Sequence, residues 1–205
     1  MRNGKTASQV AQPTREYMRW IEKNAILLRQ RAQVQALELL DPRMCKDKLD
    51  LQFIVLEGIE KLSPAILRAL KSLDARKWSG ISQKLPNGDL LLALNPNMTP
   101  ERANVTIMEE AAHAHYGHKP VQLHALGDDL YQRIYDSGTE QEAYWTAAAA
   151  LLPSKAVALA VYRGETADDL AVRYNASPEL AEMRIKTLGL WSHLNPPPTI
   201  LRRAS

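Results

Sequence analysis

Two adjacent carboxylates and three histidines lie within ten residues of one another near the middle of this 205-residue chain. They are Glu109, Glu110, His113, His115 and His118, and the whole chain contains five histidines. Glu109 and His113 are four residues apart, so on a helix their side chains share one face. Two ligands at this spacing can bind one metal ion, as in the H-E-x-x-H zinc motif, where the intervening Glu polarises water. Glu109 and His113 are therefore candidate ligands, and Glu110 is a candidate general base.

A site of this kind needs a third protein ligand and an open position for water. Glu142 is the first candidate, because it begins an alanine-rich segment that is small enough to pack closely on the first helix. Glu140 is the second candidate, and on one helix its side chain would point about 200° away from that of Glu142. Carboxylate ligands weaken the preference for zinc, which leaves manganese or iron as alternatives. The same spacing also fits a solvated acidic face beside one buried histidine.

Two helices are needed to position these groups. Thr99 is a typical N-cap, Pro100 suits the first helical turn, and Gly117 should end a helix that carries residues 101–116. The second helix is expected over residues 139–152 (TEQEAYWTAAAALL) and should end at the following proline. On the first helix His115 projects away from His113 and is interpreted as a surface residue. His118 follows the expected end of the helix, where it could reach the metal, interact with the helix C-terminus or face solvent, and the last two are favoured.

The remaining pattern predicts an α+β fold that is mostly helical with a small antiparallel sheet. Asn87-Gly88 between apolar flanks indicates a hairpin, with strands from about Ile81 to Leu94 that edge the cleft. Three further segments carry weaker signals: apolar residues at helical spacing over 14–40, a strand or buried helix at 51–56, and a helix opened by Ser63-Pro64 that runs to about Leu73.

The C-terminal region predicts a helix-turn-helix-like segment. Thr166 and Ser177 are N-caps of two short helices joined by a turn, and Gly189 closes the second helix. Acidic side chains near the start of that second helix, Glu179 and Glu182, would face phosphates, which argues against DNA binding. We therefore divide the chain into a flexible arm (1–13), a metallopeptidase-like domain with an N-terminal helix (14–153), the helical segment (154–190) and a Pro-rich tail (191–205).

Composition favours a cytoplasmic protein that does not enter a membrane. The chain has a single cysteine, Cys45, which suits a reducing compartment, and no apolar run of the roughly 18–20 residues that a membrane span needs. Its N-terminus lacks the apolar core of a signal peptide. The net charge of +3 permits contact with nucleic acid without arguing for it.

In their order and spacing the motifs resemble the ImmA/IrrE family of metallo-endopeptidases. The resemblance covers roughly residues 45–190. The matching residues are Asn95-Pro96, Arg102, Glu109-Glu110-Ala-Ala-His113, Gly117-His118, Glu142-Ala143 followed by Ala147-Ala148, Leu151-Leu152-Pro153, Leu170-Ala171, Tyr174, Ser177, Arg184-Ile185 and Leu188-Gly189.

The resemblance implies a zincin-like fold, metal ligands Glu109, His113 and Glu142, and Glu110 as general base. It also implies zinc as the metal and a protein substrate, such as a transcriptional repressor, in a bacterium, phage or mobile element. The sequence departs from the family at Glu109, where a histidine is usual, and at Tyr144 and Trp145. The departure at Glu109 leaves an alternative, an inactive pseudo-peptidase that acts as a protein-binding or DNA-binding regulatory module.

Overall fold

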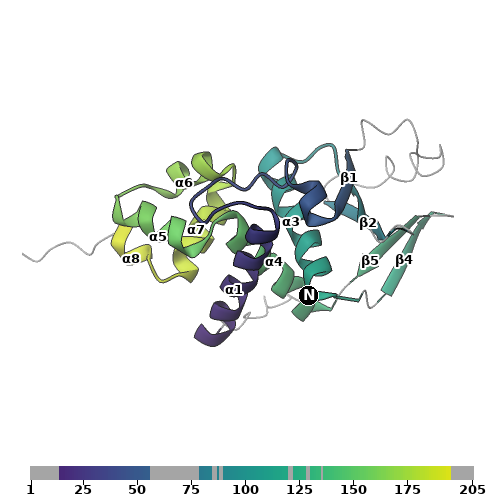
Figure 1. Ribbon diagram of the computed structural model, residues 1–205, viewed down its shortest axis with the longest axis horizontal. Helices are drawn as coiled ribbons and strands as arrows, with labels where there is room; N and C mark the ends of the chain where they lie inside the picture. Colours follow the sequence, from purple (N-terminus) through teal and green to yellow (C-terminus); the bar gives the residue numbers. More distant parts are fainter. Residues whose placement is uncertain are drawn as a thin grey trace, which may run out of the picture.

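The computed structural model describes residues 14–55, 79–84, 87, 90–119, 122–127, 130–134 and 136–194. Within these ranges the chain is mostly helical with two small sheets, so the α+β class is confirmed (Figure 1). The expected arm at 1–13, the helix expected from Ser63 to Leu73 and the tail beyond residue 194 lie outside the described residues.

The first helix, α1 (Arg15–Arg31), begins as expected but ends earlier. Thr14 caps it, because its side-chain oxygen accepts a hydrogen bond from the amide of Tyr17 at 3.2 Å. The chain leaves the helix at Gln33, whose φ of 58° lies in the left-handed region. The prediction of a helical pattern up to residue 40 is therefore wrong beyond Arg31.

A buried arginine explains why α1 stops. The guanidinium of Arg29 donates hydrogen bonds to the carbonyls of Ala150 and Glu38, both at 2.6 Å, and to that of Gln35. These bonds hold the segment after α1 in a non-helical path against α4, and they satisfy carbonyls that a helix would otherwise have used. The spacing of apolar residues in the sequence does not reveal that Arg29 will bind these carbonyls.

The larger sheet has the order β1-β3-β2 and is mixed in direction. Strand β2 (Gly80–Lys84) pairs antiparallel with β3 (Leu90–Leu94), and Lys84 lies opposite Leu90, as the Asn87-Gly88 turn predicted. Strand β1 (Leu51–Val55) pairs parallel with β3, so residues 51–55 form a strand and the sheet is not purely antiparallel. A Cβ on Gly80 would lie 2.9 Å from the Thr106 methyl group, so glycine here lets a helix approach the sheet closely.

A second, two-stranded sheet lies in the chain between α3 and α4, where the sequence pattern predicts no strand. Strand β4 (Gln122–Gly127) pairs antiparallel with β5 (Leu130–Ile134), with an irregularity in register between Ala125 and Gly127. Polar and apolar residues do not alternate cleanly in either strand, which is why the pattern gave no signal.

Helices α3 (Pro100–Tyr116) and α4 (Ser137–Leu151) pack against each other at the centre of the molecule, and α1 packs on α4 (Figure 1). The predicted caps of α3 are confirmed: Thr99 accepts from the amide of Arg102 at 3.3 Å, and Gly117 has a φ of 66°. On α4 the cap is Asp136. The small residues that allow close packing are fully buried: Ala143, Ala147, Ala148, Ala149 and Ala150.

The C-terminal helices are α5 (Ser154–Tyr162), α6 (Ala167–Tyr174), α7 (Pro178–Thr187) and the single turn α8 (Trp191–Leu194). The α6–α7 pair begins at the predicted caps, Thr166 and Ser177. The tail expected from residue 191 differs from prediction at its start, since α8 is helical. The ammonium group of Lys186 lies 4.4 Å from the centre of the Trp191 ring, which draws this turn onto α7.

Among the helices in the described ranges, none is by itself long and apolar enough to cross a bilayer. Helices α4 and α5, bent by 52° to each other, meet the requirement of length and composition only when taken together.

Candidate functional site

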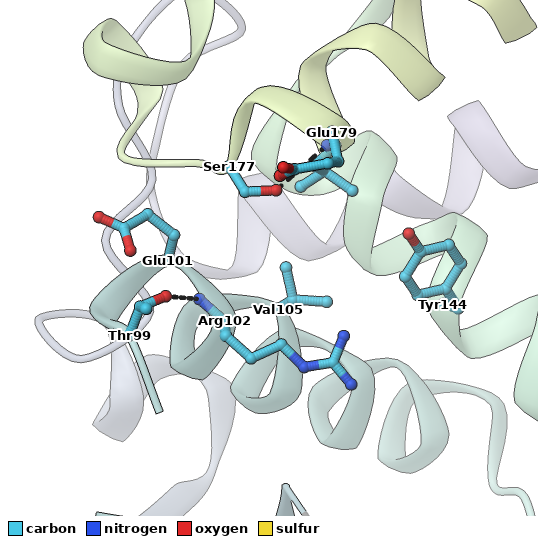
Figure 2. Close-up of a pocket in the computed structure, with 8 residues that line it drawn as sticks. Thr99, Glu101, Arg102, Val105, Tyr144, Ser177 and Glu179 are labelled. Carbon is cyan, nitrogen blue, oxygen red and sulfur yellow. Dashed lines mark hydrogen bonds between the residues drawn. The ribbon is translucent and has the colours of Figure 1, made fainter. Parts of the chain in front are cut away.

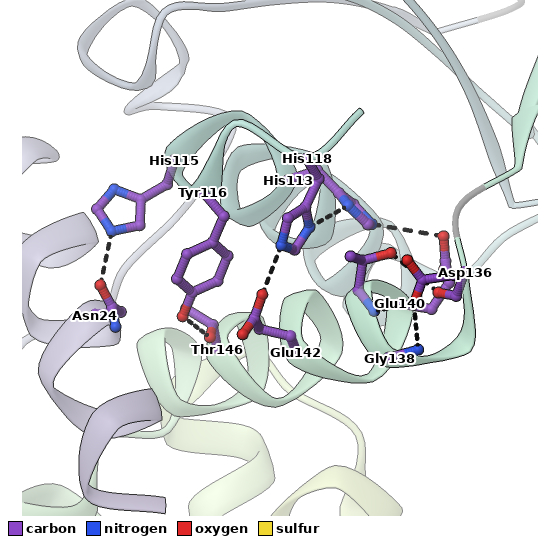
Figure 3. A network of polar contacts seen from close by, with 11 residues as sticks. Asn24, His113, His115, Tyr116, His118, Asp136, Gly138, Glu140, Glu142 and Thr146 are labelled. Atoms are coloured by element: carbon purple, nitrogen blue, oxygen red, sulfur yellow. Dashed lines mark hydrogen bonds and ion pairs between the residues drawn. The ribbon is translucent and has the colours of Figure 1, made fainter. Parts of the chain in front are cut away.

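The predicted residues Glu109, Glu110 and His113 lie on the C-terminal half of α3, where the helix packs on the first turns of α4. Glu109 and Glu110 are half-buried, and His113 is 5% exposed. Just beyond, Gly117 turns the chain back, and the amide of His118 donates a hydrogen bond to the carbonyl of His113 at 3.0 Å. This reversal returns the His118 ring to the side of His113 (Figure 3).

The two histidine rings and a glutamate from α4 form a continuous polar chain. The Nδ1 atoms of His113 and His118 are 2.9 Å apart, and Nε2 of His118 is 2.6 Å from Oε2 of Glu142 (Figure 3). The His118 side chain is only 8% exposed, and that of Glu142 is 23% exposed. Glu142, the predicted third ligand, therefore contacts His118 and reaches His113 only through it.

Glu140, the second candidate, lies on the other side of His113. Its Oε1 is 3.7 Å from Nε2 of His113, and its side chain is 55% exposed. This placement follows from helix geometry, because residues two apart on α4 point about 200° from each other. The two glutamates consequently approach opposite nitrogens of the histidine pair.

The electrostatics of the site favour a neutral His113 and bring the pKa of Glu109 close to neutral pH in the metal-free protein. Burial raises the pKa of Glu109 to about 7; nearby Glu140 and Glu110 add to the rise and Arg102 opposes it. Burial, together with His118, lowers the pKa of His113 to about 4. A neutral imidazole is the form that binds a metal ion.

The donor chemistry fits a divalent transition metal, since imidazole and carboxylate are the groups that zinc, manganese and iron accept. In the described part of the chain, no three such side chains converge on one point as metal ligands. Instead, two nitrogens of the histidine pair contact each other, and each outer nitrogen approaches a carboxylate.

Helix α1 supports the site through a row of rings. Tyr17 stacks on Trp20, Trp20 stacks on Tyr116 with ring centres 4.9 Å apart, and Tyr116 stacks on His118 at 5.1 Å. The Tyr116 hydroxyl lies 2.7 Å from the hydroxyl of Thr146 on α4. Through these contacts, the orientation of the His118 ring depends on α1 and α4.

The sequence favours contact of His118 with the helix C-terminus or with solvent over contact with a metal ion, and the structure places it inside the cluster. A glycine after a helix is a signal for a left-handed cap, which directs the next residue back along the helix. That signal at Gly117 was the only sequence feature that could have placed His118. His115 does project elsewhere, as expected, and its Nε2 lies 3.0 Å from the side-chain oxygen of Asn24 on α1.

A cavity of about 360 Å³ adjoins the site on the side of the helix N-termini (Figure 2). It lies between the starts of α3 and α7 and includes the ring of Tyr144 from α4. Both Arg102 and Tyr144 line it, and both interact electrostatically with Glu109. Tyr144, one of the departures from the family pattern, is thus half-buried and borders an open space.

Comparison with known proteins gives a family but no near relative. No curated protein matches the chain. Among solved structures, a Mycobacterium tuberculosis transcriptional regulator matches with 12% sequence identity and a TM-score of 0.48. The match covers 83% of this chain and 47% of that protein, so this chain spans just under half of its length.

The family comparison is more informative. Residues 72–186, more than half of the chain, match the model of peptidase family M78, described as the IrrE N-terminal-like domain. The matched range contains α3, α4 and the full histidine–glutamate cluster. The resemblance to ImmA/IrrE proteins is therefore confirmed, and this chain belongs to the M78 peptidase family.

Proposed function

We propose that this protein is a metal-dependent endopeptidase that hydrolyses a peptide bond in a protein substrate. The observation that supports this function is the buried, neutral His113 on α3, one turn after Glu109 and Glu110 and facing the carboxylates of α4. Packing of α3 between the sheet and α4 is compatible with a zincin-like arrangement. The family suggests a regulator, such as a transcriptional repressor, as the substrate.

For the metal ligands we propose Glu109, His113 and Glu140, with zinc as the metal and manganese or iron as alternatives. Glu140 replaces Glu142 as the third ligand because it approaches Nε2 of His113, whereas Glu142 is held by His118. Glu140 also contributes, after burial, to the raised pKa of Glu109. A divalent cation between them would remove this repulsion.

A metal ion held by these residues would supply a Lewis acid for the scissile carbonyl. Glu110 takes a proton from the attacking water and then transfers it to the nitrogen of the leaving amine. Burial of the site at the α3–α4 interface limits the access of bulk water, which strengthens these electrostatic interactions. Arg102 and Tyr144, which border the adjoining cavity, are positioned to contact the bound peptide.

Metal analysis of the purified full-length protein tests this function. The wild type is expected to bind one equivalent of zinc, manganese or iron; Glu110→Gln should keep the metal, and His113→Ala should lose it. His115→Ala is the matched control, because this histidine lies on the same helix end and contacts α1 instead. A wild-type protein that binds no stoichiometric metal after incubation with these ions would exclude the proposal.

The alternative of a regulatory pseudo-peptidase is distinguished from an enzyme by comparing binding and cleavage of the partner by the wild type and by Glu110→Gln. Such a protein would bind its partner regulator equally well as wild type and as Glu110→Gln, with no cleavage by either.

DNA binding by the α6–α7 pair receives no support from its charges. Arg184 is fully buried, Lys186 pairs with Glu182 at 2.8 Å, and Glu179 stays exposed at the start of α7.

A further inference from the structure

We infer that Glu142 and His118 form a relay that fixes which nitrogen of His113 carries the proton. In this relay Glu142 and His118 are positioning residues, and His113 is held with its proton on Nδ1 and a lone pair on Nε2. The chemistry of the relay depends on the contacts alone, whereas its consequence for metal binding rests on the proposed function.

The direction of the relay is set at Glu142. An ionised carboxylate has no hydrogen to donate, so it can only accept a hydrogen bond. Nε2 of His118, 2.6 Å from Oε2 of Glu142, must therefore be the donor and carry a proton. The contact is short and largely shielded from water, because the His118 side chain is 8% exposed.

The contact between the two rings then determines which nitrogen of His113 donates a hydrogen bond. A histidine with a single ring proton has one donor and one acceptor nitrogen, so His118 with that proton on Nε2, toward Glu142, presents a lone pair on Nδ1. Nδ1 of His113 lies 2.9 Å from that atom and therefore donates to it. His113 then has an unprotonated Nε2, and this nitrogen is the one that approaches Glu140.

The rings are held in place by groups that are not metal ligands. Gly117, with a φ of 66°, reverses the chain, and the amide of His118 bonds to the carbonyl of His113 at 3.0 Å. The His118 ring stacks on Tyr116 with an angle of 22° between the planes. The relay is thus built into the end of α3 and exists in the metal-free protein.

A metal-binding histidine is commonly supported in this way, because a partner on its second nitrogen fixes the ring and makes the first nitrogen more basic. Here the carboxylate acts through an intervening imidazole. The inference explains why Glu142 lies beside His118 and away from the nitrogen to which a metal would bind. It also assigns a role to His118, which the proposed reaction does not otherwise use.

Nitrogen-15 NMR of the histidine side chains in the metal-free, full-length protein tests the relay directly. The expected wild-type result at neutral pH is a proton on Nδ1 of His113 and a proton on Nε2 of His118. A proton on Nε2 of His113 would overturn the inference, because His118 would then be the donor between the two rings. This measurement needs no variant and no metal.

Paired variants separate the relay from simple packing. Glu142→Gln replaces an obligatory acceptor by an amide that can also donate, and Glu142→Leu removes the acceptor, so neither variant should fix the His113 tautomer as wild type does. His118→Phe keeps a ring on Tyr116 but cannot accept a proton, and His115→Phe is the matched control outside the relay. An unchanged His113 tautomer in both Glu142→Leu and His118→Phe would overturn the inference.

Zinc affinity, measured by calorimetry, gives the second readout. His118→Phe and Glu142→Leu should bind zinc about 10–100-fold more weakly than wild type, while His115→Phe stays close to it. If wild type shows the expected tautomers but binds no metal, the proposed function fails and the relay stands. If wild type binds zinc with His113 in the other tautomer, the relay fails and the function stands.

Discussion

Arg184 on α7 forms an ion pair with Glu22 on α1, although the two residues are 162 positions apart. The guanidinium is fully buried, and its Nε also donates to the carbonyl of Leu152 at 2.9 Å. The other oxygen of Glu22 accepts from the amide of Ser154 at 3.3 Å. One arginine therefore joins α7, α1 and the junction between α4 and α5.

Removing one partner of this pair should destabilise the protein strongly. Arg184→Met leaves the Glu22 carboxylate without its cation in a mostly buried place, and we expect a loss of about 3–5 kcal/mol in the free energy of unfolding. Urea denaturation measures this loss. Lys186→Met is the matched control, because the Lys186–Glu182 pair lies on the surface of the same helix and should contribute about 0.5 kcal/mol or less. Equal losses in the two variants would contradict the prediction.

Gly117 and Gly189 provide a matched pair of helix caps. Both have positive φ, 66° and 71°, and a Cβ on either would meet nothing within 4 Å. Replacement of either glycine by alanine should therefore cost about 1 kcal/mol through the backbone conformation alone. Thermal unfolding should show similar losses for the two variants.

Their effects on metal binding should differ. Only Gly117 sets the position of His118, so Gly117→Ala should weaken zinc binding and Gly189→Ala should leave it unchanged. Gly117→Asn should recover part of the loss, because asparagine tolerates the left-handed region better than alanine does. Calorimetry on the three variants checks this order, and equal zinc affinities would show that the reversal at Gly117 does not matter to the site.

The capping box of α6 should make stability depend on acid pH. The Asp169 carboxylate accepts hydrogen bonds from the amide and hydroxyl of Thr166, and these bonds lower the pKa of Asp169 below its usual value. As pH falls, the unfolded chain therefore binds this proton before the folded protein does. The contribution is present above the ordinary pKa and is lost as pH falls through the folded one.

Asp169→Asn should remove this part of the pH dependence. The measurement is the urea midpoint of wild type and variant at a series of values between about pH 5 and pH 2. Asp168→Asn is the control, since Asp168 is the neighbouring acid of the same turn but not the capping residue. A wild-type curve parallel to that of Asp169→Asn over this window would show that the capping bonds do not favour the ionised carboxylate.

Local signals allowed the site-bearing elements to be predicted from the sequence. Thr99, Pro100 and Gly117 define α3, and Thr166 and Ser177 define the start of α6 and α7, because caps and turns are determined by a few neighbouring residues. The hairpin at Asn87 follows the same logic. These predictions needed no knowledge of the rest of the fold.

Long-range contacts were the part that the sequence could not reveal. The parallel pairing of β1 with β3 joins strands about forty residues apart, and local periodicity contains nothing about the partner of a strand. The end of α1 depends on Arg29 reaching Ala150. We propose Glu140 in place of Glu142 as the third metal ligand because His118 lies between Glu142 and His113. The sequence does not show this position of His118, and the roles of both glutamates stay predictions.

Helix α1 lies outside the part of the chain that matches the peptidase family. The recognisable peptidase region begins at residue 72, yet Glu22, Trp20 and Asn24 of α1 contact α7 and the end of α3. The matched residues 72–186 therefore cover less of the chain than the set of helices that contact one another. A fragment limited to these residues would lack α1, and with it the Trp20 ring that stacks on Tyr116 beside His118.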